Sequence, residues 1–178
     1  MPTINTRNCQ PCTACCEGWL DIKHPIAQAH LGKPCVHCEP KGCSIYSYRP
    51  LNPCQSFHCA WRQEGSLLPT PMRPDLSGAI VMTDQLQWQG EDVIVAVATG
   101  ERMPARTFHW LCSLAHLTSR QLAVVEFKKD AQGFNGEFNL RTVGPDEFTE
   151  AMQAYFSDQG FVGTHVTHPR RVIDLVAI

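Results

Sequence analysis

Cysteine is the residue type with the most chemistry to offer in this chain of 178 residues. Nine of its ten cysteines fall in three groups: C-x2-C-x2-C-C at Cys9–Cys16, C-x2-C-x4-C at Cys35–Cys43, and C-x4-C at Cys54–Cys59. Closely spaced thiolates are typical ligands of zinc and of iron–sulfur clusters. The pattern therefore predicts a cysteine-ligated metal centre. The predicted ligands are Cys9, Cys12, Cys15, Cys16, Cys35, Cys38, Cys43, Cys54 and Cys59.

The spacing of two cysteine pairs fits zinc. Cys12-x2-Cys15 is followed after 19 residues by Cys35-x2-Cys38, which falls within the C-x2-C-x15–20-C-x2-C spacing typical of zinc sites. The other five thiols then form a second site with one thiol spare, or join a shared cluster through bridging thiolates. Adjacent Cys15 and Cys16 are expected to face different metals, because successive side chains diverge in an extended backbone.

Iron–sulfur ligation is the alternative. Cys9, Cys12 and Cys15 supply the C-x2-C-x2-C triplet of a [4Fe–4S] cluster, and Cys54 or Cys59 can serve as the remote fourth ligand. The run departs from the bacterial ferredoxin pattern, because the next cysteine follows at once and no proline comes after it. Thiolates suit both metals, so Zn²⁺ and a [4Fe–4S] cluster both stand as candidate cofactors.

Other features of the sequence argue against a disulfide-bonded secreted protein, a membrane protein and a nucleic-acid-binding protein. Nine clustered cysteines cannot all pair as disulfides. The amino terminus, Met1–Gln10, lacks the apolar run of about 7–15 residues found in a secretory signal, and no later stretch has the roughly 18 apolar residues of a membrane span. We therefore expect a cytoplasmic protein with reduced thiols and no membrane partner. A net charge of −2 gives no electrostatic support for a nucleic-acid partner.

No catalytic motif is present. The sequence has no phosphate-binding glycine loop, no G-x-S-x-G elbow and no H-E-x-x-H pair. His109, Cys112 and His116 share one face of a predicted helix, where Cys112 is expected to be a small core residue bordered by the histidines. Whether the protein is an enzyme is left open, with oxidoreductase activity expected only if an iron–sulfur cluster is bound.

The positions of proline and glycine along the chain indicate which elements must position the cysteines. Residues 1–62 are rich in proline and glycine, which predicts an irregular metal-chelating module with one short helix at Pro25–Leu31. Residues 63–78 form a Pro-rich connecting arm. Residues 79–178 form a domain of unknown role, and together the parts predict an α+β protein: a Cys-rich metal-binding module plus a small antiparallel sheet with two helices.

The pattern beyond residue 78 is regular. A meander of antiparallel strands is expected first, then a helix at Ala105–Ser119, a hairpin turn at Gly133–Gly136 and a second helix at Pro145–Ser157. The predicted strands are Ala79–Met82, Gln85–Gln89, Val93–Ala98, Leu122–Phe127, Glu137–Val143 and Val172–Ala177.

The segments CQPCTACC and PCVHCEPKGCSIYSYRPLNPCQSFHCAW resemble the YkgJ-like family of zinc- or iron-chelating CxxCxxCC proteins. The resemblance covers about residues 9–62. The family's cysteines fall on Cys9, Cys12, Cys15, Cys16, Cys35, Cys43 and Cys54. Its C-x-I-Y-x-x-R-P signature falls on Cys43–Pro50, Cys38 and Cys59 match a variant, and the piece MRPDLSG resembles that variant's continuation.

The resemblance implies metal chelation by cysteine. Arg49, in the signature, is a candidate cofactor-binding residue that donates hydrogen bonds to cluster sulfurs; the alternative is that it caps a loop carbonyl. We expect a metal-ion-binding protein whose zinc is chiefly structural. The alternative is an iron–sulfur protein acting in electron transfer or as an oxidoreductase, with a protein or redox partner bound through residues 79–178.

Overall fold

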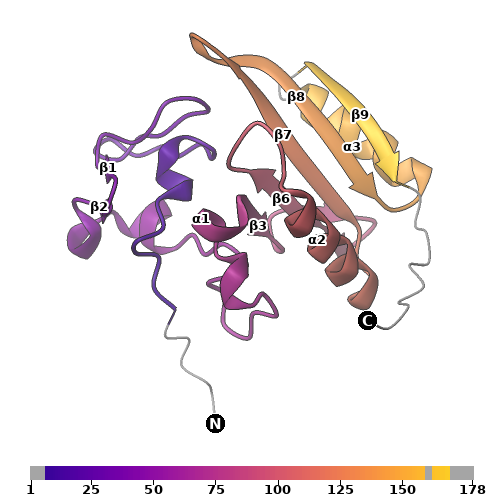
Figure 1. Ribbon diagram of the computed structural model, residues 1–178, viewed down its shortest axis with the longest axis horizontal. Helices are drawn as coiled ribbons and strands as arrows, with labels where there is room; N and C mark the ends of the chain where they lie inside the picture. The colour runs from indigo at the N-terminus through magenta and orange to yellow at the C-terminus, as the bar shows by residue number, and fades with distance from the viewer. Residues whose placement is uncertain (1–6, 159–161, 169–178) are drawn as a thin grey trace.

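The computed structural model describes residues 7–158 and 162–168. Figure 1 shows two regions: the Cys-rich segment, indigo to violet, lies at one side of a sheet built by the later part of the chain. The α+β class predicted from sequence is confirmed. Across the described residues, no helix has the length and apolar composition needed to cross a bilayer.

The main sheet has five strands in the order β3-β6-β7-β8-β9. Their bounds are β3 Ala79–Met82, β6 Ile94–Ala98, β7 Leu122–Asp130, β8 Gly133–Val143 and β9 Val162–His168. The pairs β3–β6 and β7–β8 are antiparallel, whereas β6–β7 and β8–β9 are parallel. The prediction of an antiparallel sheet was therefore wrong for this main sheet, which is mixed.

The mixed directions follow from two crossover helices. Helix α2 (Ala105–Leu117) connects β6 to β7, and helix α3 (Asp146–Asp158) connects β8 to β9. A helix that carries the chain back along the sheet starts the next strand in the same direction as the last, so each pair is parallel. Both helices were predicted within two residues of their observed ends, but the apolar pattern of a strand does not record its direction.

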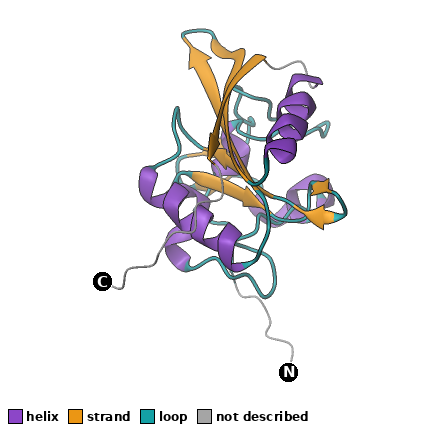
Figure 2. Ribbon diagram, turned by 90° about the vertical axis from the view of Figure 1, so that its right-hand side faces the viewer, coloured by secondary structure: helices purple, strands orange, loops and turns teal. Residues whose placement is uncertain are grey.

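The two helices cover opposite faces of the sheet (Figure 2). On β8, Phe138 packs against Phe156 of α3 with ring centroids 5.5 Å apart. Three residues later, the Arg141 guanidinium lies 3.9 Å from the ring centroid of Phe108 in α2. Because successive strand residues point to opposite faces, an odd separation of three places these contacts on different sides.

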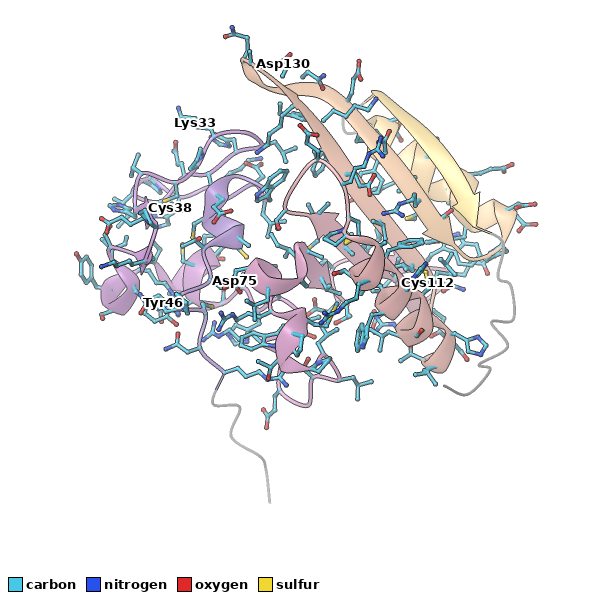
Figure 3. All side chains as sticks on the ribbon, viewed as in Figure 1. Lys33, Cys38, Tyr46, Asp75, Cys112 and Asp130 are labelled. Carbon is cyan, nitrogen blue, oxygen red and sulfur yellow. The ribbon has the colours of Figure 1, made fainter. Side chains whose placement is uncertain are left out.

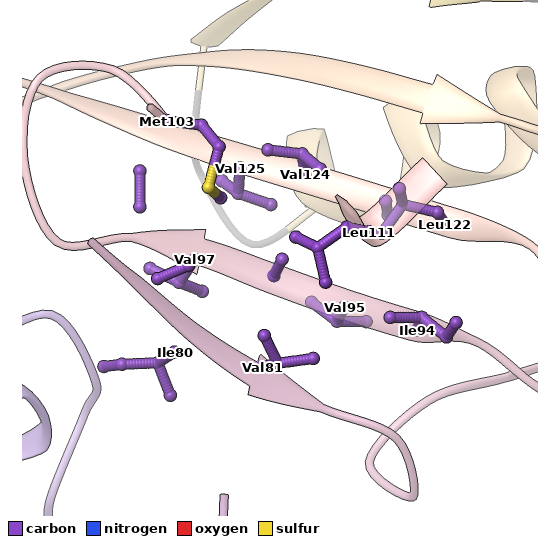
Figure 4. Packing of buried hydrophobic residues seen from close by; sticks show 14 of the residues in the cluster. Ile80, Val81, Ile94, Val95, Val97, Met103, Leu111, Leu122, Val124 and Val125 are labelled. Carbon is purple, nitrogen blue, oxygen red and sulfur yellow. The ribbon is translucent and has the colours of Figure 1, made fainter. Parts of the chain in front are cut away.

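The core lies between β3, β6, β7 and the helices. Figure 4 shows the aliphatic side chains of the three strands packed with Leu111 of α2. Strand β6 is buried along its whole length, as expected for a central strand covered on both faces. This core supplies the rigid support on which the Cys-rich segment rests.

Two local predictions for the sheet were wrong. The segment after β3 does not continue a meander, because β4 (Gln87–Trp88) and β5 (Glu91–Asp92) form a separate two-stranded hairpin. The β7–β8 turn lies at residues 131–132, between paired Asp130 and Gly133, and not at the predicted Gly133–Gly136. Phe134 extends the hairpin by packing edge-on against Phe127, with ring centroids 5.3 Å apart.

The Cys-rich segment is irregular, as predicted, but the expected helix at Pro25–Leu31 is absent. Instead, Ile22 and Ala29 exchange backbone hydrogen bonds of 2.8 and 3.1 Å, and His30 pairs with Lys33. These bridges require an extended backbone on both sides of Pro25. The short elements of this part are the 3-10 helices Ala14–Glu17 and Tyr46–Tyr48, the helical turn Leu51–Gln55, and the strands β1 (Cys38–Glu39) and β2 (Gly42–Cys43).

The segment 63–78, expected as a connecting arm, contains a 3-10 helix at Thr70–Met72 and the short helix α1 at Pro74–Ser77. Leu68 and Met72 are buried in the same core as the sheet. Strand β9 was not predicted as a strand. The predicted strand at Val172–Ala177 lies outside the described residues.

Candidate metal centre

A single cavity of about 320 Å³ collects most of the predicted ligands. Eight of the nine cysteines line it, drawn from all three sequence groups. They are Cys9, Cys12, Cys15, Cys16, Cys35, Cys43, Cys54 and Cys59. Ile45, Phe57 and Trp61 line it as well, so the thiols are surrounded by apolar side chains. Cys38 is absent from this lining.

A tight turn positions the last two cysteines of the first group. The 3-10 helix Ala14–Glu17 carries Cys15 and Cys16, and the Cys16 N–H donates to the Thr13 carbonyl at 2.7 Å. Gly18 ends this helix with φ of +83°, a left-handed conformation that glycine adopts without strain. A Cβ at this position would lie 2.5 Å from the His30 carbonyl oxygen. The close approach brings the loop that leads to Cys35 against the first group.

Backbone hydrogen bonds connect the first and second groups. The Cys35 N–H donates to the Cys16 carbonyl at 2.8 Å, and the Cys38 N–H donates to the Cys35 carbonyl at 2.9 Å. The second bond closes the turn of this C-x2-C pair. Cys38 then pairs with Cys43 across β1 and β2. The first two groups are thus held together by main-chain contacts.

Arg49 organises the loop that carries Cys54. Its guanidinium donates to the carbonyl oxygens of Cys54 at 3.2 Å and of Tyr46 at 2.6 Å, and it stacks on the Tyr46 ring with its central carbon 3.8 Å from the centroid. Of the two roles considered for Arg49, these hydrogen bonds are those of a residue that caps loop carbonyls. Arg49 also lines the cavity, where its charge opposes the rise in the pKa of Cys54 that burial produces.

Burial keeps Cys12, Cys15 and Cys16 protonated at neutral pH. It raises the pKa of Cys12 to about 11 and that of Cys16 to about 12. The pKa of Cys15 rises well above its ordinary value for the same reason, with the charges of neighbouring thiols adding to the effect. A metal ion bound here would therefore have to displace protons from these thiols.

The thiols converge on the cavity without meeting in coordination geometry. Among residues 7–158 and 162–168, no three side chains of histidine, cysteine, aspartate or glutamate are arranged to hold an ion as they stand. The chemistry of the donor set nevertheless suits zinc or an iron–sulfur centre, because eight soft sulfur donors border one enclosed volume.

The other candidate residues lie apart from the thiols or at the margin of the cavity. His37 lines the cavity, with its Nε2 2.8 Å from the Ile26 carbonyl oxygen. Cys112, half-buried on α2, lies far from Cys38 and the rest of the cluster, as Figure 3 shows. His109 and His116 on the same helix are exposed. The helix face is thus not part of this site.

The sequence interpretation missed one contact to the site. The backbone N–H of Asp75, in α1, donates to the thiol of Cys12. The Asp75 carboxylate is held in turn by Arg73 through hydrogen bonds of 2.6 and 2.8 Å. The piece MRPDLSG, noted for its resemblance to the family variant, contains both residues.

A scan against protein-family models finds no match, and searches of the curated proteins and of the solved structures find no significant match.

Proposed function

We propose that the cavity binds metal through its cysteine thiolates and that the metal is zinc with a chiefly structural role. The observation that carries this proposal is the convergence of eight thiols from three separate sequence groups on one cavity. Eight cysteines around one cavity offer the soft sulfur donors that zinc takes in structural sites, which supports this proposal.

The small apolar content of the Cys-rich segment supports a structural role. Among residues 7–58, the large buried apolar side chains are Trp19, Ile22 and Ile45, and the remaining buried ones are alanines and a cysteine. Such a segment gains little from burial, at about 25 cal/mol per Å² of apolar surface. A structural zinc contributes on the order of 10 kcal/mol at neutral pH, which can supply the missing stability.

Limited proteolysis with and without a strong chelator tests this role. The full chain, purified without oxygen, should contain stoichiometric zinc, and chelation should make residues 9–62 sensitive to protease while the sheet survives. Zinc-free protein that resists protease equally well would contradict the proposal. Chelated protein reloaded with zinc serves as the control and should regain its resistance.

The second candidate function is an iron–sulfur protein acting in electron transfer or as an oxidoreductase, with a redox partner bound through residues 79–178. The apolar part of the cavity lining, which includes Phe57, Trp61 and Met82, favours it because cluster potentials depend on the exclusion of water. Brown protein containing iron and acid-labile sulfide would support this candidate, whereas colourless protein containing zinc would support the first.

A further inference from the structure

Six of the eight cavity thiols divide between two separate apolar clusters. Cys59 belongs to the main core, and Cys12 and Cys15 pack against that core. Cys35 belongs to a small second core built by Ile22, Ala27 and Ala29, against which Cys16, Cys38 and Cys54 pack. Of these four cysteines, Cys38 alone does not line the cavity. Packing alone therefore assigns neighbouring Cys15 and Cys16 to different clusters.

Apart from the effect of Cys16 on the adjacent Cys15, the electrostatic neighbours of these two thiols divide in the same way. After burial, the largest contributions to the raised pKa of Cys15 come from Cys59, Cys12 and the adjacent Cys16, and Cys9 also contributes. The raised pKa of Cys16 is due, after burial, to Cys43, Cys38, Cys35 and Cys54. Cys43 pairs across β1 and β2 with Cys38, which packs against the second core, and Cys9 is the remaining thiol of the cavity lining. Cys43 is therefore assigned to the second set and Cys9 to the first.

From this division we infer that the cavity holds two metal ions in two four-thiolate sites, an inference that rests on the proposed zinc-binding function. The inner site consists of Cys9, Cys12, Cys15 and Cys59, and the outer site of Cys16, Cys35, Cys43 and Cys54. Zinc in structural sites takes four ligands, so eight thiols saturate two ions.

Cys38 is the thiol left unligated. It does not line the cavity, and it hydrogen-bonds with the Thr13 side chain. The Thr13 hydroxyl contacts the Glu17 carboxylate at 2.5 Å, and this negative charge lies close to the Cys38 sulfur.

The two sites have different structural roles. The inner site joins the Cys-rich segment to the sheet, because Cys12 accepts the Asp75 N–H and Cys59 precedes Ala60, whose N–H donates to the Val81 carbonyl of β3 at 2.7 Å. The ligands of the outer site all lie within residues 16–54. Loss of the inner ion should therefore detach the segment from the sheet, whereas loss of the outer ion should loosen only the outer loops.

Zinc content of the full chain purified without oxygen tests the assignment. The wild-type chain should hold two zinc ions, Cys12→Ser and Cys35→Ser should each hold one, and the double variant should hold none. The matched control Cys38→Ser should keep two. A single zinc in the wild-type chain, loss of zinc from Cys38→Ser, or loss of both ions from one single variant would overturn the two-site assignment.

Alkylation of the wild-type protein gives a readout that does not depend on variants folding. In zinc-loaded protein, iodoacetamide should modify Cys38 and Cys112 and leave the eight cavity thiols protected until a chelator is added. Protection of Cys38 would overturn the assignment. Protein with no metal at all contradicts the proposed function itself, and four irons with sulfide per chain support its alternative and overturn the two-zinc assignment.

Discussion

The ammonium group of Lys129 lies 3.6 Å from the ring centroid of Trp19. Lys129 belongs to β7 of the main sheet, whereas Trp19 follows the first cysteine group, so this cation–π contact joins two parts of the chain 110 residues apart. Nearby, Gly32 approaches β8 so closely that a Cβ there would lie 2.7 Å from the Phe134 nitrogen. The Cys-rich segment thus rests on the β7–β8 hairpin.

Replacing Trp19 with alanine should weaken this docking strongly. Trp19 is buried in the main core, and truncating a buried tryptophan costs about 3–5 kcal/mol. Urea unfolding of the zinc-loaded protein should show this loss, while Lys129→Ala, which removes only the cation–π contact, should lose about 0.5–1 kcal/mol. Equal losses from the two variants would contradict the burial argument.

The ion pair between buried Glu126 and partly buried Arg141 is a second contact whose loss should cost much stability. Glu126 is 7% exposed, and its Oε1 accepts both an Arg141 N–H at 2.6 Å and the Met103 N–H at 2.9 Å. Arg141→Met should cost about 3–5 kcal/mol, because it leaves a buried carboxylate without its counter-charge. Thermal or urea unfolding measures this loss.

The exposed pair of Lys128 and Glu137 is the matched control. It has a similar separation of 3.1 Å, but its side chains are 39% and 52% exposed. Lys128→Met should therefore cost less than about 1 kcal/mol. A loss from Lys128→Met as large as that from Arg141→Met would show that burial is not the deciding factor.

Gly18→Ala should reduce both stability and zinc content. Any Cβ at residue 18 meets the strain of a positive φ and also lies 2.5 Å from the His30 carbonyl oxygen. Gly65→Ala is the control, because Gly65 has φ of +69° but no atom within 4 Å of an added Cβ. Gly65→Ala should lose about 1 kcal/mol of unfolding free energy and keep its zinc.

Zinc binding should release protons and strengthen as pH rises. Burial raises the pKa of Cys12 to about 11 and that of Cys16 to about 12, so these thiols carry protons at neutral pH. An ion bound by four thiolates then releases about four protons, and its apparent affinity rises until the pH passes these pKa values. Calorimetry in two buffers of different ionisation enthalpy measures this number. Binding without proton release would contradict thiolate ligation.

Part of the fold could be predicted from local pattern. Strand β3 was predicted with its observed bounds, because Ala79–Met82 is an apolar run that follows a Gly-containing turn. Helix α2 was predicted from the three- and four-residue spacing of Phe108, Leu111 and Ala115, all of which are buried. The convergence of the cysteines was predicted from their spacing alone, and the cavity places eight of them together.

The features of the fold and site that could not be predicted depend on contacts between residues far apart in the sequence. Crossover helices set the directions of β7 and β9. The β7–β8 turn differs from the predicted position because Phe127 and Phe134 pack together and extend the hairpin past the expected strand ends. The backbone contact from Asp75 to Cys12 spans 63 positions. A contact of this kind produces no hydrophobic periodicity in either segment from which it could be predicted.

The hydrogen bond from the Ala60 N–H to the Val81 carbonyl covers the outer edge of β3, the first strand of the sheet. An open strand edge is a template on which other chains can pair and aggregate. The Cys-rich segment therefore blocks pairing at this edge while it remains packed against the sheet. When the contacts that hold this segment in place are lost, the protein should self-associate through β3 while its sheet is still folded.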